Sequence, residues 1–187
     1  MREATKILSA KGLLVSRARV GTLVRDKAYW NLLDSDVLAW ITKSLPPGKF
    51  LDMIFEARMA IETHAAELAA KKATKADIDL IRAAYEDMVA ARKLEDILEP
   101  DIRFHQAIMD ATHNDVIRYI GHTLHNALSM SIKLTSWSTE IHIASLPRHK
   151  AIFLAIANRD GKAALKATQN LLKESRKDFD SRKKGKN

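Results

Sequence analysis

Cysteine is absent from this chain of 187 residues, which excludes disulfides, thiolate metal sites and thiol nucleophiles. Glycine (6 residues), proline (4 residues) and aromatic residues (6%) are also scarce. Few residues therefore interrupt the long stretches of Ala, Leu, Lys and Glu, which are good helix formers. This composition predicts an all-α protein.

Long apolar runs are missing as well. No stretch of about eighteen apolar residues could form a membrane-spanning helix. The first residues, MREATKILSAKG, lack the apolar core of a secretory signal. Both absences favour a cytoplasmic protein that does not bind a membrane.

The charge is unevenly distributed. Residues 1–25 carry six basic residues and one acidic residue, and residues 173–187 carry seven and three. Of the net charge of +8, residues 26–172 therefore contribute −1. A basic end on a nearly neutral body is typical of a nucleic-acid-contacting segment attached to a domain with another task. We interpret the C-terminal run SRKKGKN as a solvated basic tail.

Short elements are expected at the start of the chain. Gly12 can adopt the left-handed conformation that ends a helix, and Pro46 cannot continue one. The expected elements are a helix at 3–11, strands at 13–16 and 22–24 joined by RARVG, and a helix at 38–45.

From residue 48 on, the pattern of apolar residues is helical almost throughout. Breaks are expected at KKAT, around Pro100, at HND, in SWSTEIH and at NRDG. The expected helices span 49–72, 76–93, 100–112, 114–136, 146–159 and 161–181. They predict an antiparallel bundle of six to seven helices.

Two parts of the sequence resemble one family of bacterial regulators. The segment REATKILSAKGLLVSRARVGTLV is similar to the second half of the GntR-type winged helix-turn-helix, whose pattern is roughly VREALRxLxxxGLVxxxxGxGTFV. Three later motifs are similar to the FadR-type ligand-binding domain of that family, the FCD domain. They are ExRxxxE from Glu56, DxxFH from Asp101 and HKAIFLAIANRD from His149.

The resemblance implies a division into domains. The implied parts are a partial winged helix-turn-helix at 1–25, a linker at 26–35, an FCD effector domain at 36–182 and a basic tail at 183–187. Met1 stands where the family has a valine, so we expect an incomplete reading head. Either an internal GTG codon was taken as the start, or the head is truncated. Without its first helix, such a head should not bind operator DNA normally.

Within the family, the runs YWNLLDSDVLAW, DIRFH and HKAIF are similar to those of D-galactonate-responsive repressors. This likeness implies a sugar acid or related small carboxylate as effector, and the family implies a homodimer on symmetric operator DNA. In an intact reading head, the residues expected to contact DNA are Arg2, Lys6, Arg17 and Arg19.

Helical spacing leads to candidate effector-binding residues. Arg58 and Glu62 are four residues apart in the middle of an apolar helix face. A buried guanidinium must be paired or bind an anion. Arg58 therefore either forms an internal ion pair with Glu62 or binds the carboxylate of an effector, which is the role that the family favours.

Asp101 and His105 are also four residues apart, and His149 lies on another apolar face. Each histidine could be a satisfied core residue, but three helices with inward polar groups favour a shared site. The family implies a divalent metal with a further histidine at the position of Leu171, beside Asn170. We expect Asp101, His105 and His149 to bind effector hydroxyls, with or without Zn²⁺ or Ni²⁺. Asn170 is a further candidate for effector binding.

The sequence thus predicts a repressor-type transcription regulator and not an enzyme. The alternative is an all-α metal-dependent hydrolase that uses Asp101, His105 and His149. Against this alternative, the sequence contains no HExxH motif and no nucleophile elbow. The histidines without a comparable setting are His64, His113, His122, His125 and His142.

Overall fold

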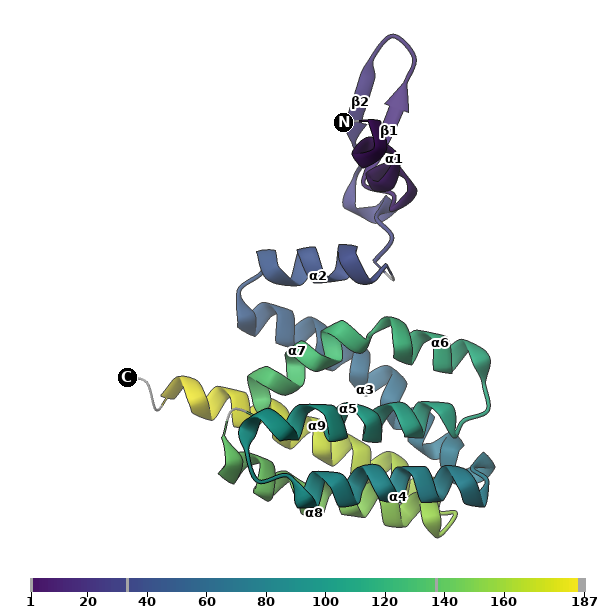
Figure 1. The fold of residues 1–187 in the computed structure, drawn as a ribbon, viewed down its shortest axis with the longest axis vertical. Helices are drawn as coiled ribbons and strands as arrows, with labels where there is room; N and C mark the ends of the chain where they lie inside the picture. The colour runs from purple at the N-terminus through teal and green to yellow at the C-terminus, as the bar shows by residue number, and fades with distance from the viewer. Residues whose placement is uncertain (1, 33, 137, 185–187) are drawn as a thin grey trace. The chain divides into compact units, whose positions relative to one another are not determined.

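The computed structural model describes residues 2–32, 34–136 and 138–184. The chain forms two compact units, Met1–Pro46 and Pro47–Asn187. Figure 1 shows the elements of both units. The described helices are all too short or too polar to cross a membrane.

The first unit contains a helix followed by a small hairpin, as the sequence predicts. Strands β1 and β2 pair antiparallel, with Leu14 opposite Val24 and Arg17 opposite Gly21. The elements are α1 (Arg2–Ala10), β1 (Leu14–Arg17), β2 (Gly21–Val24), the 3₁₀ helix η1 (Lys27–Tyr29) and α2 (Ser35–Ser44). Whether α1 and the hairpin are part of a DNA-reading head stays a prediction.

Gly12 ends α1 with a left-handed residue, as expected. Its φ is +77°, and a side-chain carbon there would collide with the carbonyl oxygen of Tyr29. The amide of Gly12 bonds to the carbonyl of Ser9, and that of Leu13 bonds to the carbonyl of Leu8. These two bonds form the Schellman motif, which satisfies the last carbonyls of a helix.

The predicted linker is more structured than expected. It contains η1, and its end is fixed by Asp34, whose side chain caps α2 and lies 2.7 Å from Lys11 Nζ. The boundary between the two compact units follows Pro46 in the sequence, so that α2 falls in the first unit and not with the helices that follow. The division into functional domains stays a prediction.

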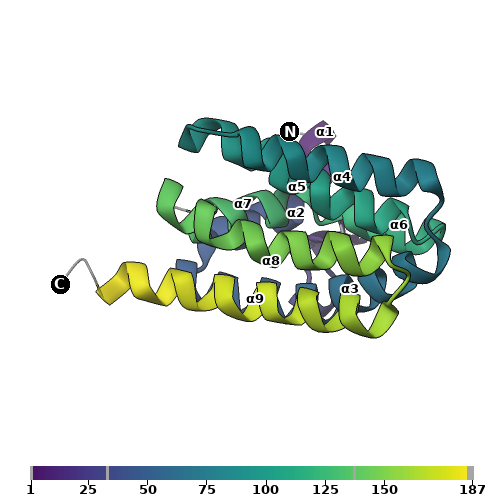
Figure 2. The same cartoon turned by 90° about the horizontal axis from the view of Figure 1, so that it is seen from below.

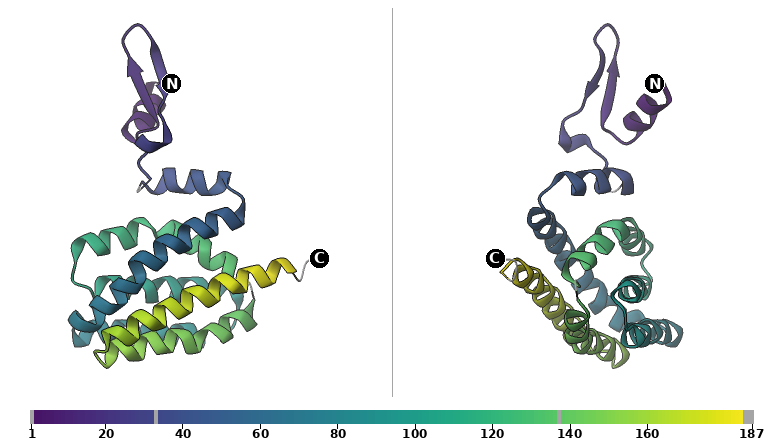
Figure 3. Two further views of the ribbon diagram at one scale, coloured as in Figure 1. Left: turned by 180° about the vertical axis from the view of Figure 1, so that it is seen from behind. Right: turned by 60° about the vertical axis from the view of Figure 1, so that its left-hand side comes forward.

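The second unit is a bundle of seven described helices. They are α3 (Pro47–Lys72), α4 (Lys75–Ala90), α5 (Leu94–Asp110), α6 (Asp115–Thr123), α7 (His125–Thr135), α8 (Thr139–Ala157) and α9 (Gly161–Lys184). Helix α9 packs along α3 and α8, and α4 packs against α5 and α8. Seen from below in Figure 2, α8 lies between α4 and α9. Figure 3 shows α6 and α7 on the opposite side of the bundle from α8.

Three predicted helices differ most from the structure. Helix α5 begins at Leu94 and contains Pro100, and α8 begins at Thr139 and contains Pro147. A proline removes the hydrogen bond to the carbonyl four residues earlier, but Asp96 and Ile143 are exposed, so water can take that place. The helix expected at 114–136 is divided into α6 and α7 at Leu124.

The C-terminal prediction also differs from the structure. Helix α9 continues to Lys184, so two residues of the basic tail predicted at 183–187 are helical. The rest of that tail lies outside the described residues. The bundle itself is held by a core of alanine and larger apolar side chains that includes Phe104, Ile152 and Leu171.

Candidate effector-binding site

The second unit buries a cluster of ionisable side chains from three helices. Helix α3 contributes Arg58 and Glu62, α5 contributes Asp101 and His105, and α8 contributes His149. Each of the five is at most 6% exposed. On each helix these residues occupy positions three or four apart from buried apolar ones, which is why they share the inward face.

Arg58 forms the internal ion pair that the sequence left as an alternative. Its Nε donates to Glu62 Oε1 at 2.6 Å, and its Nη2 donates to Glu62 Oε2 at 3.3 Å. The Nη1 atom donates to Ser131 Oγ at 3.2 Å, and Nη2 lies 3.4 Å from His105 Nε2. The Nε side is therefore held tightly, whereas the contacts of the two Nη atoms are long.

His105 lies between two carboxylates. Its Nδ1 is 2.9 Å from Glu62 Oε2, and its Nε2 is 3.3 Å from Asp101 Oδ1. Burial by itself would lower the pKa of His105, but the charge of Glu62 and the interaction with Asp101 raise it from 6.5 to about 9. Burial opposes ionisation of Glu62, yet the charges of Arg58 and His105 lower its pKa from 4.5 to about 2. The metal-free cluster therefore favours a charged imidazole between charged carboxylates.

His149 has a different environment. Its Nδ1 lies 3.1 Å from the carbonyl oxygen of Ser145, which can only accept a hydrogen bond, so Nδ1 carries the proton. Burial lowers the pKa of His149 from 6.5 to about 4, against the opposing charge of Asp101. A neutral ring thus presents the lone pair of Nε2 toward Asp101.

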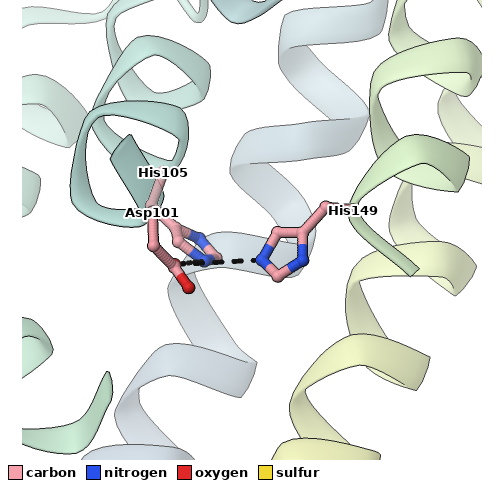
Figure 4. Close-up of side chains that lie close together, drawn as sticks. All are labelled: Asp101, His105 and His149. Carbon is pink, nitrogen blue, oxygen red and sulfur yellow. Dashed lines mark ion pairs between the residues drawn. The ribbon is translucent and has the colours of Figure 1, made fainter. Parts of the chain in front are cut away.

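Asp101, His105 and His149 fit a divalent metal ion. Their side chains point toward one another in Figure 4, and one ligand atom from each lies within 4.8 Å of the others. Asp101 Oδ1 and His149 Nε2 are buried and receive no aligned hydrogen bond. Both imidazoles are held through Nδ1, one by a carboxylate and one by a carbonyl, as is usual for metal-binding histidines. The donor set suits Zn²⁺ or a similar ion.

Little free space adjoins the cluster. A cavity of about 20 Å³ is lined by residues that include Arg58, Glu62 and His105, together with Gly121 of α6, Leu128 of α7 and Leu124 between these two helices. This volume is enough for roughly one water molecule. A larger surface groove of about 800 Å³ lies between α3 and α9, but its lining includes none of the five clustered residues.

Two neighbouring positions on α9, Asn170 and Leu171, differ in burial. Asn170 is exposed, so the structure does not bring it into the cluster; helical spacing turns Thr168, Leu171 and Leu172 inward instead. Leu171 belongs to the apolar core. On the α9 side, the hydroxyl-bearing residue beside Glu62 and His105 is Thr168, which lines a small second cavity.

Sequence reasoning missed three buried polar residues near the cluster. Ser131 on α7 receives a hydrogen bond from Arg58, Thr168 lies on α9, and His142 is on the same helix as His149. His142 could have been found from its spacing of seven residues to His149, which places both on one helix face. The sequence predicts a helix only from 146, whereas α8 begins at Thr139 and includes both histidines.

The four residues expected to contact DNA all lie in the first unit and are exposed. Arg2 and Lys6 are on α1, and Arg17 and Arg19 are at the tip of the hairpin. Lys6 forms an exposed ion pair with Glu3 at 3.1 Å. Arg19 adopts a left-handed conformation with φ of 63°.

Comparison with known proteins identifies the second unit. Residues 53–174, more than half of the chain, match the FCD domain. The chain belongs to the FCD domain family. The cluster of Arg58, Glu62, Asp101, His105 and His149 falls entirely within the matched FCD region.

Relatives of this FCD protein are transcription regulators. It is 30% identical over 177 residues to the galactonate operon transcriptional repressor of Escherichia coli (strain K12), covering 94% of the chain and 77% of that protein. It is 29% identical over 180 residues to the Uxu operon transcriptional regulator of the same organism, covering 88% of the chain and 65% of that protein. Membership of a family of regulators and not of enzymes is thus confirmed, and the hydrolase alternative finds no support.

A solved structure of a GntR protein from Streptococcus agalactiae has a similar fold. The two chains superpose with a TM-score of 0.63 at 23% sequence identity, over 94% of this chain and 79% of the other. This likeness confirms the predicted helical fold.

Proposed function

We propose that this chain is a repressor whose FCD domain senses a small hydroxy carboxylate, and that the buried cluster is the effector site. The observation that carries the proposal is the burial of five ionisable side chains in one bundle. Apolar side chains of similar volume often give equal or greater stability. A role in ligand binding explains why the cluster is charged.

Arg58 is the proposed partner of the effector carboxylate. Its Nε is occupied by Glu62 at 2.6 Å, whereas its Nη1 and Nη2 make contacts of 3.2 to 3.4 Å. A carboxylate could therefore bind the Nη edge with two parallel hydrogen bonds while Glu62 keeps Nε. Arg58 then has both roles that the sequence left open.

Asp101, His105 and His149 are the proposed partners of the effector hydroxyls or of a divalent ion. An ion held by these three residues would supply a Lewis-acidic centre for carboxylate and hydroxyl oxygens. Three protein ligands leave coordination positions open for such oxygens. Because the exposed side chain of Asn170 lies outside the cluster, we omit it from the proposed site.

Effector binding must displace part of the FCD domain. A cavity of about 20 Å³ has no room for a sugar acid, so Leu124, Leu128 or their neighbours must move when it binds. In a homodimer that contacts operator DNA through Arg2, Lys6, Arg17 and Arg19, such a movement would change the spacing of the DNA-binding segments. The effector shifts this equilibrium only through its different affinity for the two arrangements.

A thermal-shift screen tests the effector proposal. D-galactonate and D-gluconate are added to the chain with chelator, with Zn²⁺ and with Ni²⁺. An acid at about one hundred times its Kd adds roughly 2.7 kcal/mol, or several degrees in Tm. The shift should be lost in Arg58→Lys, which keeps the charge without the planar fork, and retained in the exposed control Arg82→Lys. Equal shifts in both variants would contradict the role of Arg58.

Because we expect an incomplete reading head, this chain should bind DNA only weakly, and DNA binding is tested separately at low salt with fluorescently labelled duplex DNA. Neutralising Arg17 and Arg19 together should weaken binding and reduce its dependence on salt. Neutralising Lys162 and Lys166 on the exposed side of α9 is the matched control. If both pairs weaken binding equally, the hairpin has no special role.

A further inference from the structure

The inward face of α8 changes from polar to apolar along its length. Its buried residues are His142, Ser145, His149, Ile152, Ala155 and Ile156. The last three belong to the apolar core of the bundle. His142, Ser145 and His149 bury polar groups that lose their hydrogen bonds to water on folding. This loss is unfavourable unless other partners replace the water. The polar half of this face therefore needs an explanation beyond packing.

His142 has only half of its hydrogen-bonding capacity satisfied. The ring is 1% exposed, and its Nε2 lies 2.8 Å from the carbonyl oxygen of Met88, near the end of α4. A carbonyl only accepts, so Nε2 is the donor, and the neutral ring then offers Nδ1 as an acceptor. That Nδ1 atom is buried and has no hydrogen-bond partner.

The described part of the chain has three buried side-chain atoms that receive no aligned hydrogen bond. They are Asp101 Oδ1, His142 Nδ1 and His149 Nε2. Two of the three belong to the proposed effector site. His142 lies two helical turns before His149 on the same face of α8, which corresponds to about 10 Å along the helix axis. Ser145, between them, donates to the carbonyl of His142 at 2.7 Å and is already satisfied.

All three atoms are hydrogen-bond acceptors. Asp101 and His149 can be satisfied by a donor or by a divalent ion, whereas His142, which lies outside the candidate metal ligands, needs a donor. A ligand with one short polar end could satisfy Asp101 and His149 but would not extend to His142. A ligand that binds at Asp101 and His149, directly or through the ion, and carries hydroxyl groups along an extended carbon chain could place a donor near His142. The arrangement therefore selects for ligand length as well as for charge.

We propose that His142 is the distal contact of the effector site, where Nδ1 accepts a hydrogen bond from a hydroxyl at the far end of the effector. This inference rests on the proposed function, because it needs the carboxylate end to lie near Arg58, Asp101 and His149. It assigns the effector to the five- and six-carbon polyhydroxy acids and excludes three-carbon hydroxy acids as the preferred ligands.

The variant His142→Gln separates this role from a structural one. The amide nitrogen of glutamine can take the place of Nε2 and keep the bond to Met88, but glutamine has no group in the place of Nδ1. Isothermal titration calorimetry on the full chain, with Zn²⁺ present, compares D-galactonate with the three-carbon acid D-glycerate. In His142→Gln, the affinity for D-galactonate should fall about tenfold, as expected for one lost hydrogen bond. The affinity for D-glycerate should change less than about twofold.

Ile143→Gln is the matched control, because Ile143 neighbours His142 on α8 and is exposed; it should bind both acids like the wild type. Equal losses for both acids in His142→Gln, or no loss for either, would overturn the distal contact. If neither acid binds the wild-type chain, the proposed function itself fails.

A second measurement does not depend on the fold of a variant. In wild-type chain with ¹⁵N-labelled histidine, D-galactonate should shift the Nδ1 resonance of His142, whereas D-glycerate should shift His149 and leave His142 unchanged. An unchanged His142 resonance with saturating D-galactonate would overturn the proposal.

Discussion

Glu62 binds Arg58 at two points inside the bundle, through Oε1 to Nε at 2.6 Å and through Oε2 to Nη2 at 3.3 Å. The same Oε2 atom lies 2.9 Å from His105 Nδ1. One carboxylate thus orients both the proposed anion-binding arginine and one proposed metal-binding imidazole. Changes at Glu62 should therefore affect stability and both binding functions together.

Removal of one partner of this ion pair should destabilise the fold strongly. Glu62→Leu leaves the Arg58 charge buried and without its main partner, which costs about 3–5 kcal/mol of unfolding free energy. The double variant Arg58→Met, Glu62→Leu should be more stable than Glu62→Leu, because no buried charge remains unpaired. Urea denaturation of Arg58→Met, Glu62→Leu and the double variant gives the coupling free energy between the two residues. Strictly additive losses would contradict a coupled pair.

Zn²⁺ affinity should depend on His149. His149→Gln removes a ligand, so its loss of affinity should exceed the roughly 10- to 100-fold that follows loss of a supporting group. Competition with a chromophoric chelator measures this change. His64→Gln is the control, because its side chain is 71% exposed. A similar loss in the control would mean that the ion binds elsewhere.

Leu171→His should strengthen Zn²⁺ binding. Leu171 is buried one turn after Thr168, which lines a cavity beside His105. An imidazole at this position would add a fourth protein ligand and complete a tetrahedral site. The same competition assay should show at least about a tenfold gain. An unchanged affinity in a folded variant would show that position 171 does not face the ion.

The stability of the metal-free chain should fall at alkaline pH. The pKa of His105 rises from 6.5 to about 9 on folding, so the folded state binds the proton more tightly than the unfolded state. The resulting stabilisation is fully present below 6.5 and is lost as the pH rises through about 9. Urea unfolding with chelator at about pH 6 and about pH 9.5 measures the fall. His105→Gln should show a smaller fall, and an equal fall in both proteins would contradict the assignment.

Two glycines of the first unit should differ in their tolerance of alanine. Both have positive φ, +77° at Gly12 and +97° at Gly21, so alanine strains each by about 1 kcal/mol. Only at Gly12 does an added carbon collide with backbone, the carbonyl of Tyr29. Gly12→Ala should therefore accelerate amide hydrogen exchange at Leu13 more than Gly21→Ala does. Equal acceleration would show that the collision is relieved without cost.

For Arg58, the sequence predicts the position of the side chain, and the tertiary structure determines its binding partner. A spacing of four residues is enough to place Arg58 and Glu62 on one buried face, because the helix period is fixed. The spacing cannot decide whether Glu62 or an external anion binds the guanidinium. That outcome depends on the space left by α6 and α7, which is about 20 Å³ and is set by tertiary packing.

The sequence by itself determined the helical class, the left-handed end of α1 at Gly12 and the inward direction of Asp101, His105 and His149. These follow from local propensity and from periodicity, which act within a few residues. Tertiary structure decided that α5 and α8 continue through Pro100 and Pro147. Packing of the whole bundle can outweigh one missing hydrogen bond, and local rules do not include that packing. Because α8 begins at Thr139, the buried ring of His142 lies on the same face as His149, a relation that only the folded chain shows.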